Sequence, residues 1–475
     1  MSRAETDRQI NGRFALSVGP STLPAPAGWT WMKLTDVARL ESGHTPSRQH
    51  PEYWDGDIPW IGIKDAREHH GVVIFSTAQT VTQAGIDNSA ARVLPEGTVC
   101  LSRTASVGYV TVMGRPMATS QDFVNWVCSD ALDPRFLQFL ILAEGEGILR
   151  FGKGSTHTTI YFPEVMAFHV CIPPVNEQRR IVAKLEALLA RSRRAKEALD
   201  AIPALLEQFR QSVLAAAFRG DLTAKWREQR GLRDEGGDLP TGWRATTVGA
   251  VSREIQYGYT AKARSDGQGP RMLRITDIQD RQVNWATVPT CEIAPSEEQK
   301  YALSPGDIVF SRTGATTGKS CLIQDCPRAV FASYLIRLRA GEEVVPRLLS
   351  QYFQTARYWE QITENLAGNA QPGCNASKLA ALSLPLPPVE EQDEMVRAIE
   401  ERFTAIDRLH AVVEEARGSA SAIDSALLAK AFRGELVEQD PNDEPASVLL
   451  ERIRRERMEG DKPTRSRRNK SAAAG

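Results

Sequence analysis

The sequence is poor in the features that mark disulfide-rich, metal-bound or membrane proteins. Its seven cysteines are scattered along 475 residues, and no two of them form a C-x-x-C pair. An odd, dispersed set of this kind argues against a disulfide framework and against a zinc site. No apolar run approaches the roughly 20 residues of a membrane-spanning helix, and the first residues contain no apolar core of a secretory signal. We therefore expect a cytoplasmic protein that carries no metal.

The sequence also lacks a surplus of charge of either sign. Lys and Arg number 58, Asp and Glu number 59, and the formal net charge is −1. This balance neither demands nor excludes a nucleic-acid partner, because only a local cluster of positive charge would matter. One local surplus lies at the carboxyl end, where residues 451–475 contain nine Lys or Arg and four Asp or Glu. A basic tail ending in Ala and Ser is typical of a disordered segment.

Signatures of catalysis and of nucleotide binding are missing as well. The stretch FSRTGATTGKS, from Phe310 to Ser320, resembles a phosphate-binding loop, but Gly314 and Gly318 enclose only three residues. A phosphate-binding loop needs four residues there so that its backbone N–H groups can wrap a phosphate. H-E-x-x-H, G-x-S-x-G and the N-P-P-[YF] stretch of amino-methyltransferases are also absent. Together, these absences argue against a nucleotide-binding enzyme and against the enzyme classes that carry these motifs.

The chain contains the same pattern twice. Residues 173–222 (PPVNEQ…AFRGDL) align without a gap to residues 387–436 (PPVEEQ…AFRGEL), at an offset of 214. Upstream, Trp29 matches Trp243, and GTVCLSRT at 97–104 matches GDIVFSRT at 306–313. Both copies keep Ser-Arg-Thr, but the first has Tyr109 where the second has Lys319. This pattern indicates two copies of a variable domain, each followed by a constant segment.

Each constant segment predicts a long amphipathic helix. Apolar residues recur at helical spacing at Ile181, Val182, Leu185, Leu188 and Leu189, and again at Met395, Val396, Ile399, Phe403, Ile406, Leu409, Val412 and Val413. Pro203 and Gly418 predict a break between a longer and a shorter helix. The equal, gapless lengths favour an antiparallel pair of helices, and the alternative is that each helix packs only on its own domain. Short runs such as GTVCLS, FVNWVC and YLIRLRA predict strands in the variable regions.

The repeated Pro-Pro-x-x-Glu-Gln helix, ending in Ala-Phe-Arg-Gly-Asp/Glu-Leu, resembles that of the specificity subunits of type I restriction-modification systems. The resemblance covers about residues 23–436. It implies an α+β fold with two β-rich target-recognition domains, each followed by long helices that pair as an antiparallel coiled coil. It also implies a non-catalytic subunit that reads a bipartite site in double-stranded DNA and directs adenine methylation and restriction. The implied partners are two methyltransferase subunits, which bring S-adenosylmethionine, and motor-nuclease subunits, which bring ATP.

The repeat and the resemblance together predict the domain boundaries. A flexible extension (1–22) precedes the first target-recognition domain (23–172) and the central helical spacer (173–222). A linker (223–238) leads to the second target-recognition domain (239–386), the distal helical spacer (387–436) and a carboxyl-terminal helix with a basic flexible tail (437–475).

Two sets of loops are the candidates for contact with DNA. The first set follows the Ser-Arg-Thr strands and holds Arg103, Thr104, Arg312, Thr313 and Lys319. The second set precedes each Pro-Pro pair, differs between the copies, and holds Lys153, Ser155, Thr156, His157, Thr158, Asn369, Gln371, Asn375 and Lys378. Cationic side chains and hydroxyls bind phosphates, whereas Arg, Lys, Asn and Gln read base edges in the major groove. The alternatives are that the shared arginines fix their own fold and that the second loops are simply solvated.

Two functions of a different class are the rivals: an ATP- or GTP-binding enzyme that uses Gly314 to Ser320, and an adaptor. A duplicated coiled-coil adaptor, whose β-rich domains bind protein instead of DNA, would show the same repeat and the same lack of catalytic motifs.

Overall fold

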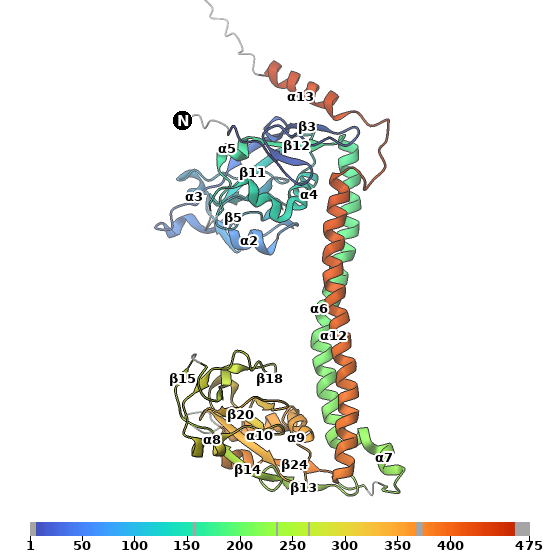
Figure 1. Cartoon of the computed structure of the whole chain (residues 1–475). Helices are drawn as coiled ribbons and strands as arrows, with labels where there is room; N and C mark the ends of the chain where they lie inside the picture. Colours follow the sequence, from blue (N-terminus) through green and yellow to red (C-terminus); the bar gives the residue numbers. More distant parts are fainter. Residues whose placement is uncertain (1–5, 155–157, 234–235, 265–266, 367–373, 461–475) are drawn as a thin grey trace, which may run out of the picture. The chain divides into compact units, whose positions relative to one another are not determined.

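The computed structural model describes residues 6–154, 158–233, 236–264, 267–366 and 374–460 (Figure 1). The chain divides into two compact units, the first made of residues 1–197 and 417–475 and the second of residues 198–416. Each unit contains one β-rich domain together with one part of the long helices α6 (Val175–Arg219) and α12 (Val389–Phe432).

Three sheets make up the first domain, within the residues described, with strand orders β1-β2-β12-β3, β10-β5-β7 and β4-β11-β8-β9-β6. Its strands are β1 (Ile10–Asn11), β2 (Leu16–Val18), β3 (Thr30–Lys33), β4 (Ala38–Ser42), β5 (Trp54–Ile61), β6 (Val73–Ile74), β7 (Gln79–Val81), β8 (Val99–Ser102), β9 (Val110–Met113), β10 (Ala118–Thr119), β11 (Phe123–Cys128) and β12 (Phe168–Ile172). Its helices are α1 (Leu34–Val37), α2 (Ile63–Glu68), α3 (Gln83–Asp87), α4 (Pro134–Glu144) and α5 (Phe162–Met166).

The second domain repeats the strand order of the first. The order β4-β11-β8-β9 recurs as β14-β23-β20-β21, and the parallel pair β10–β5 recurs as β22–β16. Its strands are β13 (Arg244–Thr247), β14 (Ser252–Tyr257), β15 (Ala263–Arg264), β16 (Arg271–Leu273), β17 (Ile278–Gln279), β18 (Gln282–Val283), β19 (Thr290–Cys291), β20 (Ile308–Ser311), β21 (Ser320–Leu322), β22 (Ala329–Phe331), β23 (Leu335–Ala340) and β24 (Ser383–Leu386). Its helices are α7 (Ala224–Glu228), α8 (Pro295–Tyr301), α9 (Pro346–Tyr352), α10 (Ala356–Leu366) and α11 (Ala376–Ala381). The sequence repeat is therefore a repeat of topology.

Helices α6 and α12 pack side by side and run in opposite directions, as predicted (Figure 1). In the first unit, an early part of α6 meets a late part of α12, and Lys196 Nζ lies 2.6 Å from Asp424 Oδ2. In the second unit, a late part of α6 meets an early part of α12, and Arg210 Nη2 lies 2.6 Å from Asp407 Oδ1. The predicted apolar stripe supplies the buried face, including Leu185 in the first unit.

Two details of the helix prediction were wrong. Both helices continue through Pro203 and Gly418 instead of breaking there. An interior proline removes one backbone hydrogen bond at a cost of about 3 kcal/mol, which the packing of a long apolar face outweighs. Leu409 and Val412, which belong to the predicted stripe, are 52% and 60% exposed, because the seam is narrower than the stripe and takes Ile406 and Val413.

The predicted flexible extension at 1–22 was wrong for the described part of that segment, which contributes two strands. Strand β2 lies inside a sheet between β1 and β12, and its residues Leu16 and Val18 are fully buried. The run A-L-S-V is too short to stand out as a strand by its pattern alone. The predicted linker 223–238 is likewise ordered at its start, where Thr223 and Arg227 are buried.

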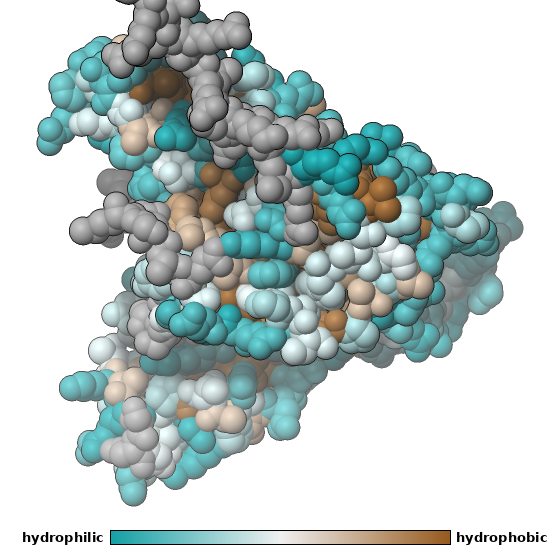
Figure 2. Space-filling model, turned by 90° about the horizontal axis from the view of Figure 1, so that it is seen from above, coloured by the Kyte–Doolittle hydropathy of each residue, from teal (hydrophilic) through white to brown (hydrophobic). Residues whose placement is uncertain are grey.

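The predicted carboxyl-terminal helix is α13 (Ala446–Gly460), and its residues Ala446 and Leu450 join the core of the first unit. The basic tail at 461–475 lies outside the described residues. Among the helices that the structure describes, none combines the length and the apolar composition needed to cross a bilayer. The face of the molecule shown in Figure 2 is mainly hydrophilic, with hydrophobic residues in small separate groups.

Candidate nucleic-acid interface

The structure joins the two predicted loops of the first domain. Arg103 follows strand β8, and its backbone carbonyl accepts a hydrogen bond from the N–H of Ile160 at 2.9 Å. Ile160 ends the loop that Lys153 begins, and paired backbone bonds between Lys153 and Thr159 close that loop. Two segments more than 40 residues apart in the sequence therefore form one surface.

The second domain makes the same junction. Arg312 follows strand β20, and its carbonyl accepts a hydrogen bond from the N–H of Cys374 at 3.0 Å. Asn375 then begins α11, and its Oδ1 accepts a hydrogen bond from the N–H of Lys378 at 2.8 Å. This helix cap holds Asn375 in one orientation at the edge of the loop.

In the first domain, the shared arginine is partly committed to the fold. Arg103 Nη2 donates to the carbonyl of Gln121 at 3.2 Å, and its guanidinium lies 4.7 Å from the ring centre of Phe162. The Thr104 hydroxyl donates to Asp122 at 2.6 Å. These contacts favour the reading of Arg103 as a residue that fixes its own loop, although both residues stay half-exposed.

Lys153 also has a structural partner. Its Nζ lies 2.9 Å from Oε1 of Glu164, whose side chain is 1% exposed, and Arg8 approaches the same oxygen at 3.4 Å. Burial raises the pKa of Glu164, but the hydrogen bond and charge of Lys153, a backbone hydrogen bond and the hydrogen bond from Arg8 together lower it, and the net pKa lies below its usual value. Thr158 is half-buried in the closed loop, and the predicted Ser155, Thr156 and His157 lie outside the described residues.

In the second domain, the shared arginine is exposed. Its guanidinium lies 4.8 Å from the ring centre of Tyr257, and no carboxylate of the described residues lies within salt-bridge distance of Arg312. Thr313 is exposed beside it, and Lys319 is exposed at the end of the same loop. Asn369 and Gln371 lie outside the part of the chain that the structure describes.

Sequence reasoning missed the exposed tyrosines next to these loops. Tyr161 is 49% exposed beside the first loop, and Tyr334 is 66% exposed, with its carbonyl accepting a hydrogen bond from the N–H of Arg312 at 3.1 Å. Tyr257 is 38% exposed, and its hydroxyl accepts a hydrogen bond from the N–H of Ala376. A large aromatic ring within a polar, Gly-bearing stretch was the available signal, because such rings are enriched at binding surfaces.

The GATTGKS loop has a structure of its own that differs from a phosphate-binding loop. The N–H groups of Thr317, Gly318 and Lys319 all donate to carbonyls of the same loop. The loop then enters strand β21, whereas a phosphate-binding loop leads into the amino end of a helix. These three backbone donors are therefore occupied within the loop.

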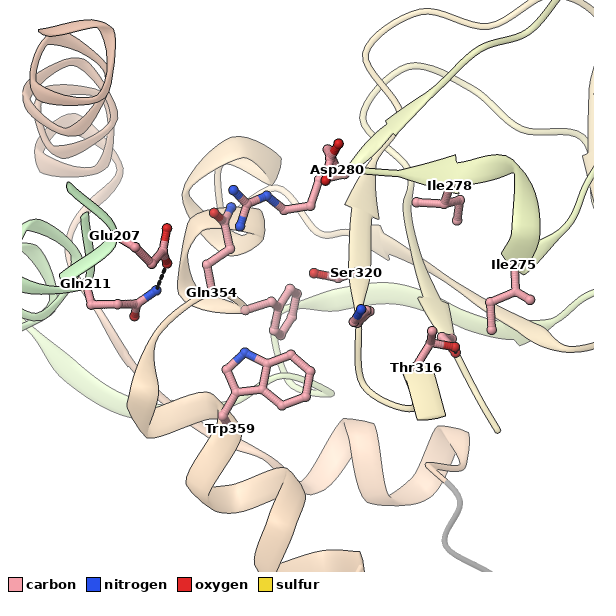
Figure 3. A pocket seen from close by; sticks show the side chains of 13 residues that line it. Glu207, Gln211, Ile275, Ile278, Asp280, Thr316, Ser320, Gln354 and Trp359 are labelled. Atoms are coloured by element: carbon pink, nitrogen blue, oxygen red, sulfur yellow. Dashed lines mark hydrogen bonds between the residues drawn. The ribbon is translucent and has the colours of Figure 1, made fainter. Parts of the chain in front are cut away.

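A cavity of about 430 Å³ opens beside this loop (Figure 3). Its walls come from α6, from the β17–β18 hairpin, from residues 311–320, and from the segment 353–359. The first unit has a cavity of about 520 Å³ between residues 70–72, α4 and the paired helices. Among the described residues, no group of three or more His, Cys, Asp or Glu side chains could hold a metal ion.

The constant Glu-Gln pairs fasten each domain to its helix. Gln178 accepts the N–H of Asp133 at 2.8 Å and donates to the carbonyl of Pro173 at 3.0 Å. Gln392 repeats this with the N–H of Val345 and the carbonyl of Pro387. The preceding glutamates accept the indole N–H of a tryptophan at 2.9 Å in both copies, as Trp29–Glu177 and Trp243–Glu391. The repeated motif therefore sets the orientation of each domain on its own helix.

Comparison with known proteins identifies the family of this architecture. A family model described as "Type I restriction modification DNA specificity domain" matches residues 26–203 and 274–414. These two ranges cover more than half of the chain, and the chain belongs to this family.

Three curated relatives show how far the likeness extends. The chain is 28% identical over 303 residues to the EcoKI specificity subunit of Escherichia coli strain K12, covering 61% of this chain and 64% of the relative. It is 30% identical over 311 residues to the StySPI specificity subunit of Salmonella potsdam, covering 62% and 65%. These two matches span less than two thirds of each relative. The EcoDI specificity subunit of E. coli matches over 463 residues at 24% identity, covering 91% of this chain and 96% of the relative.

Two solved structures share the fold. A chain from a study of "complex assembly and conformational transition of the type I R-M system" has a TM-score of 0.66 at 22% identity, covering 87% of this chain and 100% of that one. The HsdS subunit from Thermoanaerobacter tengcongensis has a TM-score of 0.54 at 21% identity, covering 88% and 99%. At this level of identity they confirm the α+β fold with long paired helices.

Proposed function

We propose that this chain is the DNA sequence-specificity subunit of a type I restriction-modification complex. One observation carries the proposal: the same pair of loops meets in both domains through a backbone bond, at Arg103–Ile160 and at Arg312–Cys374. The scaffold and the arginine are shared, while the neighbouring side chains differ. Two readers of different half-sites require this combination, because shared residues position the duplex and differing residues discriminate bases.

In this proposal the two domains use the shared arginine differently. Arg312 is free to bind a phosphate or a base edge, with Asn375 presented next to it by its helix cap. Arg103 supports the loop that begins at Lys153, and the described end of that loop, near Thr158 and Tyr161, faces the half-site. Each domain would read one half of a bipartite duplex site.

The chain itself would be non-catalytic. Adenine methylation would belong to two methyltransferase subunits that bind S-adenosylmethionine, and restriction would belong to motor-nuclease subunits that use ATP. Support for a protein partner comes from the helical pair of the second unit, where Phe209, Leu409 and Val412 are 52%, 52% and 60% exposed. Exposed apolar side chains on a pair of helices are typical of a surface that another protein covers.

The test is the adenine methylome of a host that expresses the chain with its methyltransferase subunit. The expected result is methyl-adenine at one bipartite motif with a fixed gap. Replacing the first domain by that of a relative should then change one half of the motif and leave the other half and the gap intact.

The structure sets the boundaries of this exchange. The replaced segment should run from residue 6 to residue 172, because β1 and β2 pair within the same sheet as β12. An exchange starting at residue 23 would leave these strands behind with the wrong partner. Methylation without a motif, or a motif that the exchange leaves unchanged, would contradict the proposal and favour the protein-binding adaptor.

A further inference from the structure

We infer that the cavity between α6 and the second domain binds a nucleotide, with its base against an aromatic wall and its phosphate toward two cations. The cavity shares Lys319 with the loop that begins at Arg312, but the inference does not require that this loop reads DNA. The source of the ligand is either a free mononucleotide or a nucleotide of a DNA strand, and both present the same chemistry.

The size and the aromatic wall fit a base. The cavity of about 430 Å³ lies in the usual range for small-ligand sites, roughly 300–1,000 Å³. Phe353 and Trp359 line one side, and Trp359 remains 36% exposed. Every base offers a flat face that stacks on such a ring, and stacking of this kind tolerates any base.

Two amides supply hydrogen bonds at the other side. Gln211 Nε2 donates to Glu207 at 3.1 Å, and Gln354 Nε2 donates to the carbonyl of Ser350 at 3.2 Å. Figure 3 shows the Gln211 side chain directed from α6 into the cavity, whereas the Gln354 amide points away from Trp359, toward the side where Asp280 lies. A glutamine amide has two donor hydrogens and one acceptor oxygen, so each held amide keeps groups that can meet a base edge.

Two cations line the cavity, together with the carboxylates of Glu207 and Asp280. Lys319 is exposed, and no carboxylate of the described residues lies within 4.0 Å of its ammonium. Arg281 is the second residue of the two-residue turn between β17 and β18, where both Asp280 and Arg281 have positive φ, 49° and 62°. Glycine or asparagine is favoured in such a turn. An arginine at this position adopts a backbone conformation that arginine rarely takes, and its side chain places a cation at the cavity.

The first domain does not repeat this lining. Tyr109 replaces Lys319, and its ring packs edge-on against His70 with ring centres 5.6 Å apart. In the cavity of the first unit, Arg135 is paired with Glu186 at 2.9 Å and Lys196 with Asp424 at 2.6 Å. The inference is therefore specific to the second domain, and the first domain acts as an internal control.

The test is titration of the full chain with AMP and dAMP, monitored by saturation-transfer NMR. Lys319→Met keeps the length of the side chain without its charge, and we expect it to weaken nucleotide binding at least tenfold. Lys225→Met is the matched control, because Lys225 is exposed on α7 of the same unit and does not line the cavity. Trp359→Ala should remove saturation transfer to the base protons.

Absence of binding by either nucleotide at millimolar concentration would overturn the inference. So would equal displacement by inorganic phosphate and by AMP, since the aromatic wall would then contribute nothing. Displacement of AMP by a single-stranded oligonucleotide would identify a DNA strand as the source, and failure of displacement would identify a free nucleotide. The methylome reports separately on DNA reading, so nucleotide binding can fail while a bipartite motif persists.

Discussion

Arg227 Nη1 lies 2.6 Å from Glu391 Oε1, and the two side chains are 2% and 0% exposed. The same carboxylate accepts hydrogen bonds from the Thr223 hydroxyl at 2.6 Å and from the Trp243 indole at 2.9 Å. The three donors surround one buried carboxylate. Their hydrogen bonds link the start of α12 to the segment after α6 and to the residues just before the first strand of the second domain. In the first copy the tryptophan is kept, but Arg180, the arginine whose charge acts on Glu177, is 36% exposed, so the two copies should respond differently to mutation.

Arg227→Ala should destabilise the second unit by about 3–5 kcal/mol, because it leaves the buried Glu391 without its charge partner. The measurement is chemical unfolding followed by tryptophan fluorescence. Arg230→Ala is the matched control, since Arg230 is exposed and stacks only on Trp226 at 3.9 Å. Equal effects of the two substitutions would contradict a structural role for the buried pair.

The two equivalent glutamates, Glu391 and Glu177, should also differ in how much stability their replacement costs. Glu391→Gln removes the partner of Arg227 and should lower the unfolding midpoint, whereas Glu177→Gln should be tolerated at neutral pH. Burial raises the pKa of Glu177, and the indole of Trp29 and the charge of Arg180 offset this only in part. A glutamine can still accept the indole hydrogen bond without the penalty of a buried charge.

A pH dependence follows from the raised pKa of Glu177. Its ionisation penalises the folded state at pH values above the folded pKa, and this penalty fades as pH falls toward the unfolded value of 4.5. Glu177→Gln should therefore stabilise the first unit at pH 7 more than at pH 5. Thermal melts of both proteins at the two pH values provide the check, and an equal difference at both would contradict the assignment.

Gly418→Ala should stabilise the protein by about 0.5–1 kcal/mol, because the helix is continuous there and alanine is the better helix former. A Cβ at this position would meet no atom within 4 Å. Gly434→Ala is the contrasting variant: its φ is +72° and a Cβ would lie 2.9 Å from Pro26 Cβ, so it should destabilise. The measurement is thermal unfolding, and a lower melting temperature for Gly418→Ala would contradict a helix that is continuous at this position.

Arg312→Ala should weaken DNA binding by the assembled complex and reduce the slope of log K against log salt by about 0.9, the value for one lost phosphate contact. Fluorescence anisotropy at several salt concentrations measures both quantities. Arg357→Ala is the control, as Arg357 is exposed on α10 of the same domain. If Arg312 reads a base instead, discrimination between sites will fall while the salt slope stays nearly constant.

Phe209→Ser should weaken association with the methyltransferase subunit without destabilising the chain, because Phe209 is 52% exposed on α6. Gln208→Ser, at the neighbouring exposed position, is the control. Size-exclusion chromatography with light scattering reports the stoichiometry, and intact binding by the Phe209 variant would place the partner surface elsewhere.

The sequence by itself determined the architecture, since the gapless repeat, the apolar stripes and the Pro-Pro-x-x-Glu-Gln segments are local patterns that specify helices, strands and their duplication. It also determined which loops follow the Ser-Arg-Thr strands. It did not show that β2 enters the first sheet or that α6 continues through Pro203, because a three-residue strand and a proline-containing helix are stabilised by contacts with distant residues. Only the tertiary structure brought Arg103 to Ile160, Arg312 to Cys374 and Arg227 to Glu391, because each of these pairs is decided by chain topology and burial, which no local pattern encodes.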